Sequence, residues 1–222
     1  MKYVKMLGLA AVAAMGLMAF LGASTASATV LCTTPNETAK CAAGWDYVKG
    51  TIWDASIEPG TTAILESTGG LFEDTCTEST VAGEQENTGS STETVKIEIK
   101  DVTVTNTTAP GLSFGNCTKP TKVLNPNGTM EFHWEEKPEN DNATVTASGF
   151  EVTVEAISGV SCVYSAGAGL DVGTATSGSM GTIHINAIVN KKSGSFLCPA
   201  DSVWKASYTI TDPNSAVYAT TK

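Results

Sequence analysis

Alternation of apolar and polar residues is the sequence feature that most limits how this chain can fold. It is clearest near the C-terminus, where four apolar residues share one parity: Trp204, Ala206, Tyr208 and Ile210. A period of two is typical of a β-strand with one buried face. The same period recurs over residues 130–135, 150–156 and 183–189. No stretch after residue 28 shows a sustained helical period, so the sequence predicts an all-β protein.

The cysteine pattern is the second constraint. The chain contains six cysteines, Cys32, Cys41, Cys76, Cys117, Cys162 and Cys198, and none forms a CxxC motif. An even number of cysteines in an exported chain indicates disulfides rather than a zinc ribbon or a redox motif. Similar cysteine spacings in the two halves of the chain favour sequential pairing: Cys32 with Cys41, Cys76 with Cys117, and Cys162 with Cys198.

Residues 29–222 are numerous enough to bury a substantial core in one domain. We therefore predict a disulfide-stabilised antiparallel β-sandwich over this range. An internal duplication is an open alternative, with half-repeats at about 61–118 and 144–199 that each run from a strand through a polar loop to a second cysteine. The opposing interpretation is that any two β-rich halves look alike.

Three local features carry further predictions. Ser79–Glu93 is rich in polar residues and glycine, which is typical of a mobile surface loop. The apolar parity changes between Ile99 and Val102, which predicts a β-bulge in one long strand. Asn127-Gly128 predicts a hairpin turn that leads into the strand at 130–135.

The first 28 residues have the composition of a secretion signal. Lys2 and Lys5 precede an apolar run, and Ala26-Ser27-Ala28 fits the cleavage rule. An uncleaved membrane anchor is the alternative, at the short limit of what spans a bilayer. We predict cleavage after Ala28 and a secreted, extracellular protein.

The charge balance excludes several partners. The formal net charge is −10, and the chain has no arginine. Such a surface lacks the cations that neutralise phosphates, so nucleic acid is not an expected partner. Docking on anionic lipid headgroups and stable membrane insertion are not expected either.

Metal binding has two weak candidates. Glu131, His133 and Glu135 share one face of a predicted strand and offer ligands if a neighbouring strand supplies another. A solvated sheet face is the preferred interpretation, because antiparallel sheets commonly expose one polar side. The acidic segment 135–142 offers oxygen ligands for Ca²⁺ but does not follow the EF-hand pattern. No other cofactor is predicted.

Catalytic motifs are missing from the sequence, so we assign no catalytic residue. There is no Gly-x-Ser-x-Gly motif. Paired carboxylates for glycoside hydrolysis stay open, because distances between acids are not visible in a sequence. Among the aromatic residues, Trp134 and Trp204 are predicted to be core, whereas Trp45 and Trp53 are candidates for stacking on a ligand.

Two segments carry a resemblance to a known group. The run from Cys198 to Thr211, with Cys-Pro-Ala followed by Trp204 and Tyr208, is similar to the C-terminal end of small exported, β-rich proteins of high-GC Gram-positive (actinobacterial) type. The opening Leu31-Cys32 and the segment Cys41–Gly44 resemble that group too. The resemblance implies export and a β-rich fold, and it implies no activity.

These observations leave three hypotheses from different functional classes. The first is a secreted, non-enzymatic binding or cell-envelope-associated protein, with envelope polysaccharide or protein as its partner. The second is a secreted hydrolase that acts on polysaccharide through paired carboxylates. The third is a membrane-active toxin built from amphipathic hairpins. We favour the first.

Overall fold

The structure is a computed structural model that describes residues 29–35, 41–104, 107–134 and 142–220. These ranges form seventeen β-strands and contain no helix, so the all-β prediction is confirmed. The predicted signal segment 1–28 lies outside the described residues. In chain order the strands are β1 (Val30–Cys32), β2 (Ile52–Ile57), β3 (Ala63–Ser67), β4 (Glu73–Gln85), β5 (Val95–Ile99), β6 (Val102–Val104), β7 (Thr107–Ala109), β8 (Leu112–Cys117), β9 (Thr121–Asn125), β10 (Gly128–Trp134), β11 (Ala143–Ser148), β12 (Glu151–Ile157), β13 (Val160–Ser165), β14 (Leu170–Thr176), β15 (Thr182–Gly194), β16 (Asp201–Asp212) and β17 (Tyr218–Thr220).

Eight strands form a closed barrel. The hydrogen-bonded order is β2, β4, β5, β10, β11, β14, β15 and β16, and β16 pairs back onto β2. The architecture is therefore a closed barrel rather than the predicted β-sandwich. The physical reason is that β2 pairs with both β4 and β16, which joins the two ends of the sheet and removes its free edges.

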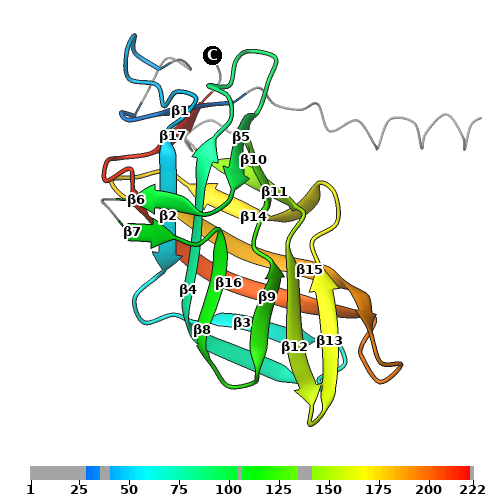
Figure 1. Cartoon of the computed structure of the whole chain (residues 1–222). Helices are drawn as coiled ribbons and strands as arrows, with labels where there is room; N and C mark the ends of the chain where they lie inside the picture. Colours follow the sequence, from blue (N-terminus) through cyan, green and yellow to red (C-terminus); the bar gives the residue numbers. More distant parts are fainter. Residues whose placement is uncertain (1–28, 36–40, 105–106, 135–141, 221–222) are drawn as a thin grey trace, which may run out of the picture.

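Three strands continue past the barrel into a second region, which we call the open lobe. β4 and β15 have 13 residues each and β16 has 12. Their outer halves carry β3 and β8 on one side and β13, β12 and β9 on the other. β8 and β9 are neighbours in the chain but do not pair with each other, so this part of the sheet stays open. Figure 1 shows β8, β9, β12 and β13 at one end of the molecule and β5 and β10 at the other.

The predicted alternation matches the observed burial. Met130 and Phe132 of β10 are buried while Glu131 between them is not, and β16 buries Trp204, Tyr208 and Ile210. The apolar residues of one parity thus fill the interior, as a period of two requires.

Ser79–Glu93 is not the mobile loop that its composition suggests. Its first half, through Gln85, is the inner part of β4. Ser79 and Gln85 are buried, and each is hydrogen-bonded: Ser79 Oγ lies 2.7 Å from the Tyr208 hydroxyl, and Trp53 Nε1 donates to Gln85 Oε1 at 3.1 Å. Polar side chains with buried partners remove the apolar alternation that would have revealed the strand.

Two turn predictions are also wrong. The parity change after Ile99 is a strand break rather than a bulge, because β6 leaves the main sheet and pairs with β7 alone. Asn127-Gly128 does not form a hairpin, since β9 pairs with β12 whereas β10 pairs with β5 and β11. Gly128 has a packing role, because a Cβ there would lie 2.3 Å from the carbonyl oxygen of Ser148.

All three predicted disulfides are confirmed. They are Cys32–Cys41, Cys76–Cys117 and Cys162–Cys198, and no cysteine is free. Three disulfides indicate an oxidising compartment. The internal duplication stays a prediction.

Candidate functional site

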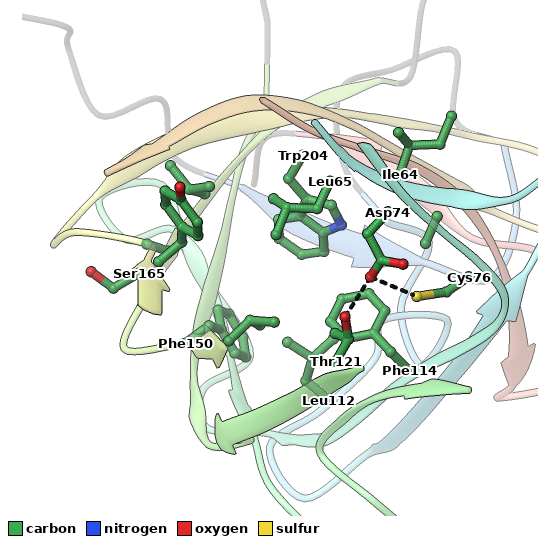
Figure 2. Close-up of a pocket in the computed structure, with 15 residues that line it drawn as sticks. Ile64, Leu65, Asp74, Cys76, Leu112, Phe114, Thr121, Phe150, Ser165 and Trp204 are labelled. Carbon is green, nitrogen blue, oxygen red and sulfur yellow. Dashed lines mark hydrogen bonds between the residues drawn. The ribbon is translucent and has the colours of Figure 1, made fainter. Parts of the chain in front are cut away.

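The open lobe surrounds a small cavity, about 40 Å³ in volume, that is partly open to solvent. Its wall comes from β3, β4, β8, β9, β12, β13, β15 and β16, so it lies inside the ring that these strands almost complete (Figure 2). Both β8 and β9 contribute side chains, which places the break in the sheet beside the cavity.

Most of the cavity wall is apolar. The main contributors are Leu65, Phe114, Val152, Tyr164, Val189 and Trp204. Trp204 faces inward because it shares the parity of Ala206 and Tyr208 on β16, and Leu65 of β3 is its partner in register. The Phe114 ring meets the Trp204 ring edge to face, with centroids 6.4 Å apart and planes at 77°. This contact holds the indole in a fixed orientation.

Among the described residues that line the cavity, Asp74 is the single charged one. Its carboxylate is buried and accepts hydrogen bonds from Thr118 Oγ1 (3.1 Å) and from the backbone N–H of Lys119 (2.8 Å) at Oδ1, and from the Thr121 hydroxyl at Oδ2. All three donors belong to the β8–β9 turn or to the start of β9. Asp74 therefore ties this turn to β4 beside the open edge.

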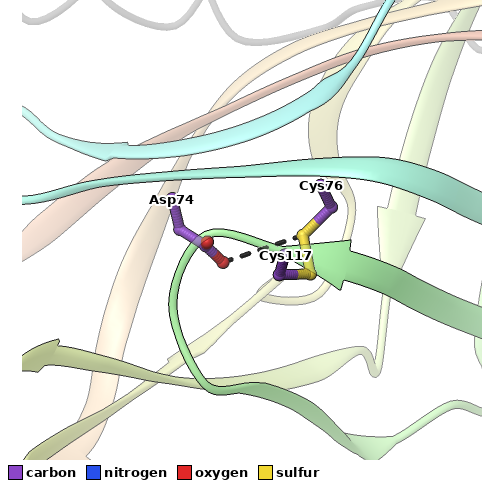
Figure 3. A group of neighbouring side chains, drawn as sticks. All are labelled: Asp74, Cys76 and Cys117. Carbon is purple, nitrogen blue, oxygen red and sulfur yellow. Dashed lines mark hydrogen bonds between the residues drawn. A yellow bond between two sulfur atoms is a disulfide. The ribbon is translucent and has the colours of Figure 1, made fainter.

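The disulfide Cys76–Cys117 lies next to the same carboxylate (Figure 3). Cys76 Sγ is 3.7 Å from Asp74 Oδ2, but a disulfide sulfur carries no proton, so this is a contact rather than a hydrogen bond. Metal binding by this Asp-Cys-Cys group would need thiolates, which the disulfide removes. The group is a structural link between β4 and β8.

The indole nitrogen of Trp204 is the unusual group in the cavity. It is buried, and it has no hydrogen-bond partner. Two other buried atoms share this condition, Asp54 Oδ1 and Ser202 Oγ. The hydroxyl of Ser202 can rotate and has the Tyr164 hydroxyl as a neighbour, and Asp54 Oδ2 accepts from Thr211. An indole has one fixed donor and no acceptor, so Trp204 cannot adapt in that way.

A polar contact separates this cavity from the barrel interior. Tyr208 and Ser79 lie at the middle of β16 and β4, between residues that line the cavity and residues that face the barrel core. The Ser79 hydroxyl donates to the Ser113 carbonyl (2.8 Å), so the Tyr208 hydroxyl donates to Ser79. Burial raises the pKa of Tyr208 well above its usual range.

The structure gives the metal candidates other partners. Glu131 forms an ion pair with Lys96 (Oε1 to Nζ, 3.1 Å), and His133 Nε2 lies 3.2 Å from Thr146 Oγ1. Glu131 Oε2 and His133 Nε2 are 4.0 Å apart on the outer face of the barrel. Glu135 and the acidic segment through residue 141, the Ca²⁺ candidate, lie outside the described residues.

The two tryptophans predicted to contact a ligand lie in different environments. Trp53 is buried in the barrel, donates to Gln85 and packs edge-on against Tyr47 at 5.0 Å, so no surface ligand can stack on it. Trp45 is 52% exposed. Trp204, which the sequence places in the core, lines the cavity of the open lobe, whereas Trp53 borders two smaller hollows inside the barrel. The alternation of the C-terminal segment gave no signal for this role of Trp204.

The acidic residues do not form the pair that a glycoside hydrolase uses within the cavity, where Asp74 is the one carboxylate. Asp54 and Asp212 face each other in register on β2 and β16. Burial raises the pKa of Asp54, the hydrogen bond from Thr211 offsets part of this, and the charge of Asp212 adds to the rise.

The histidines also lack a catalytic setting in the described part of the chain. His184 Nδ1 lies 3.0 Å from Ser207 Oγ on an exposed face, and its other ring nitrogen faces Thr182 rather than a carboxylate. A serine triad requires a third group that orients the imidazole.

A second hollow, on the outer surface, is lined by lysines and glutamates that pair with one another, such as Lys100 with Glu84 and Glu98.

Comparisons of the chain with protein-family models, curated proteins and solved structures found no match. The cavity itself is therefore the basis for assigning a function. Within the described ranges, the structure has no helix long and apolar enough to cross a membrane.

Proposed function

We propose that this protein is an exported, non-enzymatic binding protein whose open lobe holds a small, largely apolar molecule. The observation that supports this function is the apolar cavity beside the unpaired edge of β8 and β9. Ligand sites are typically concave and mostly apolar, with a few fixed polar groups. Transfer of an apolar molecule from water into such a space is favourable by about 25 cal/mol for each Å² buried.

The local chemistry favours binding over catalysis. The buried carboxylate of Asp74 has three hydrogen-bond donors and holds the β8–β9 turn, so it is committed to structure. Envelope polysaccharide, one of the two kinds of partner proposed from the sequence, usually needs exposed aromatic faces and polar partners. The apolar wall of the open lobe fits a hydrophobic ligand better.

The gap between β8 and β9 supplies the route into the cavity. Leu112 and Phe114 border it from β8, and Thr121 borders it from β9. No ladder of hydrogen bonds joins the two strands, so their separation breaks no sheet pairing. The disulfides and the predicted signal segment are consistent with export of this carrier to the cell envelope or beyond.

The direct test is binding of N-phenyl-1-naphthylamine, a neutral apolar dye whose fluorescence rises in apolar surroundings. Val152→Trp fills the cavity from β12 and is expected to weaken binding by about tenfold or more, which corresponds to about 1.4 kcal/mol. Val160→Trp is the matched control, because Val160 is half-buried on β13 and does not line the cavity.

Thermal unfolding of both variants checks that each is folded. Saturable dye binding that Val152→Trp weakens and Val160→Trp leaves intact supports the proposal. Absence of dye binding by the wild-type protein, or equal binding by both variants, contradicts it.

A further inference from the structure

We infer that the ligand of the open lobe carries a neutral oxygen acceptor, a carbonyl or hydroxyl oxygen, that accepts a hydrogen bond from Trp204 Nε1. This inference rests on the proposed function and adds the chemical class of the ligand: an apolar molecule with one uncharged oxygen group, such as a ketone, an ester or an alcohol.

The unpartnered indole nitrogen is the first observation. Trp204 is 7% exposed, and its Nε1 has neither solvent nor a protein acceptor. Buried donors in folded proteins are almost always paired, because a donor without a partner loses its hydration and gains nothing in return. An oxygen atom of a ligand inside the cavity supplies the acceptor that this N–H lacks.

The fixed position of the donor is the second observation. The indole is held by the Phe114 ring and by the pairing of β16 with β3 and β15, so its donor keeps one orientation, and only a small movement of neighbouring side chains is needed for an oxygen to reach the buried nitrogen. In Figure 2 the nitrogen lies on the edge of the Trp204 ring that is turned toward Asp74 and Thr121 rather than toward Ser165.

The charge of the cavity excludes an anion. Asp74 is the one charged residue in the wall, and no lysine or histidine lines the cavity within the described residues. A carboxylate ligand would lose its hydration beside a like charge without gaining a cation. The acceptor is therefore a neutral oxygen.

The test compares a methyl ketone with the hydrocarbon in which a methylene replaces the carbonyl. Each competes with N-phenyl-1-naphthylamine for the full mature chain. Trp204→Phe keeps an aromatic ring and removes the donor. It is expected to weaken ketone binding by about tenfold and to change hydrocarbon binding by less than about threefold.

Two controls complete the design. Trp134→Phe changes a half-buried tryptophan outside the cavity and is expected to leave both affinities unchanged. The carboxylate of the same chain length is expected to bind more weakly than the ketone at neutral pH. The indole N–H resonance of Trp204, assigned by its loss in Trp204→Phe, is expected to shift when the ketone binds and to shift less with the hydrocarbon.

The outcomes separate this inference from the proposed function. Equal weakening of ketone and hydrocarbon by Trp204→Phe overturns the inference and leaves the binding function standing. An indole resonance that ignores the ketone also overturns it, because a bound water then remains the partner of Nε1. Failure of the dye and of every ligand to bind the wild-type protein overturns both.

Discussion

The closed barrel and the open lobe share the same long strands but differ in whether the edges of their sheets are paired. In the barrel, β2 joins β4 to β16, and buried side chains such as Met130, Phe132 and Ile210 leave smaller hollows between them. In the open lobe, the ring stops between β8 and β9, and an apolar cavity remains. The incomplete ring surrounds a larger space than the closed barrel does.

The cross-links follow the same division. Cys76–Cys117 joins β4 to β8, and Cys162–Cys198 joins β13 to the turn before β16, so both lie in the open lobe. Asp74 adds a third fixed point at the β8–β9 turn. Covalent and polar links thus stabilise the region that lacks a complete hydrogen-bonded ring.

The largest expected difference between the two regions concerns core truncation. Phe132→Ala removes a buried ring from the barrel and is expected to lower the free energy of unfolding by about 3–5 kcal/mol. Phe114→Ala, at a half-buried position, is expected to cost about 1 kcal/mol. Urea unfolding measures both. Equal losses would contradict the difference in packing.

The disulfides are expected to have the next largest effect. Replacing Cys76 and Cys117 with alanine opens a loop with a sequence separation of 41 residues, and chain entropy predicts a loss of about 4 kcal/mol. The same change at Cys32 and Cys41, with a separation of 9, is expected to cost about 2.5 kcal/mol. Urea unfolding gives both values, and dye binding is expected to weaken in the first variant alone. Dye binding that survives in both would show that the cavity does not depend on this link.

A smaller effect is expected from the carboxylate that anchors the β8–β9 turn. Asp74→Asn places an amide N–H₂ against at least one hydrogen-bond donor, which is expected to cost about 1–3 kcal/mol in unfolding free energy. Glu98→Gln on the outer surface is the comparison, with an expected change below about 1 kcal/mol. A loss at Asp74 no larger than that at Glu98 would argue against the anchoring role.

The smallest expected effect concerns the hydrogen bond between Tyr208 and Ser79, which lies between the two interiors. Because burial raises the pKa of Tyr208, the folded state keeps its proton while the unfolded state loses it above about pH 10, so stability falls as the pH rises past that value. The expected contribution is about 1 kcal/mol by about pH 10.5. Unfolding at neutral and alkaline pH measures it. Tyr208→Phe is expected to remove this part of the fall and Ser79→Ala to keep it, and the reverse pattern would contradict the assignment.

Local patterns predicted the strands and cross-links but not their closure. The alternation around Phe132 and Tyr208 reports burial of one face, which is a local property, and similar spacings in the two halves indicated the cysteine pairs. The pairing of β2 with β4 joins segments about 30 residues apart and leaves no periodic signal in either. Ser79 and Gln85 were misassigned because buried polar residues with partners look like loop residues.

The cavity was beyond sequence analysis for a related reason. Trp204 was correctly predicted to face inward, but an inward position next to a filled space and one next to an empty space have the same pattern. The cavity beside Trp204 depends on the positions of Leu65, Phe114 and Asp74, which come from three other strands.

The order in which the strands alternate between the two regions has a kinetic consequence. β3, β8, β9, β12 and β13 of the open lobe interleave along the chain with barrel strands β2, β5, β10, β11 and β14. Neither interior can therefore close until segments far apart in the sequence have met, and folds dominated by such distant pairings are the slow folders among single domains, at about milliseconds to seconds. The chain must spend that interval with its apolar strands exposed, and early oxidation of Cys76 with Cys117 would shorten the search by fixing β4 against β8.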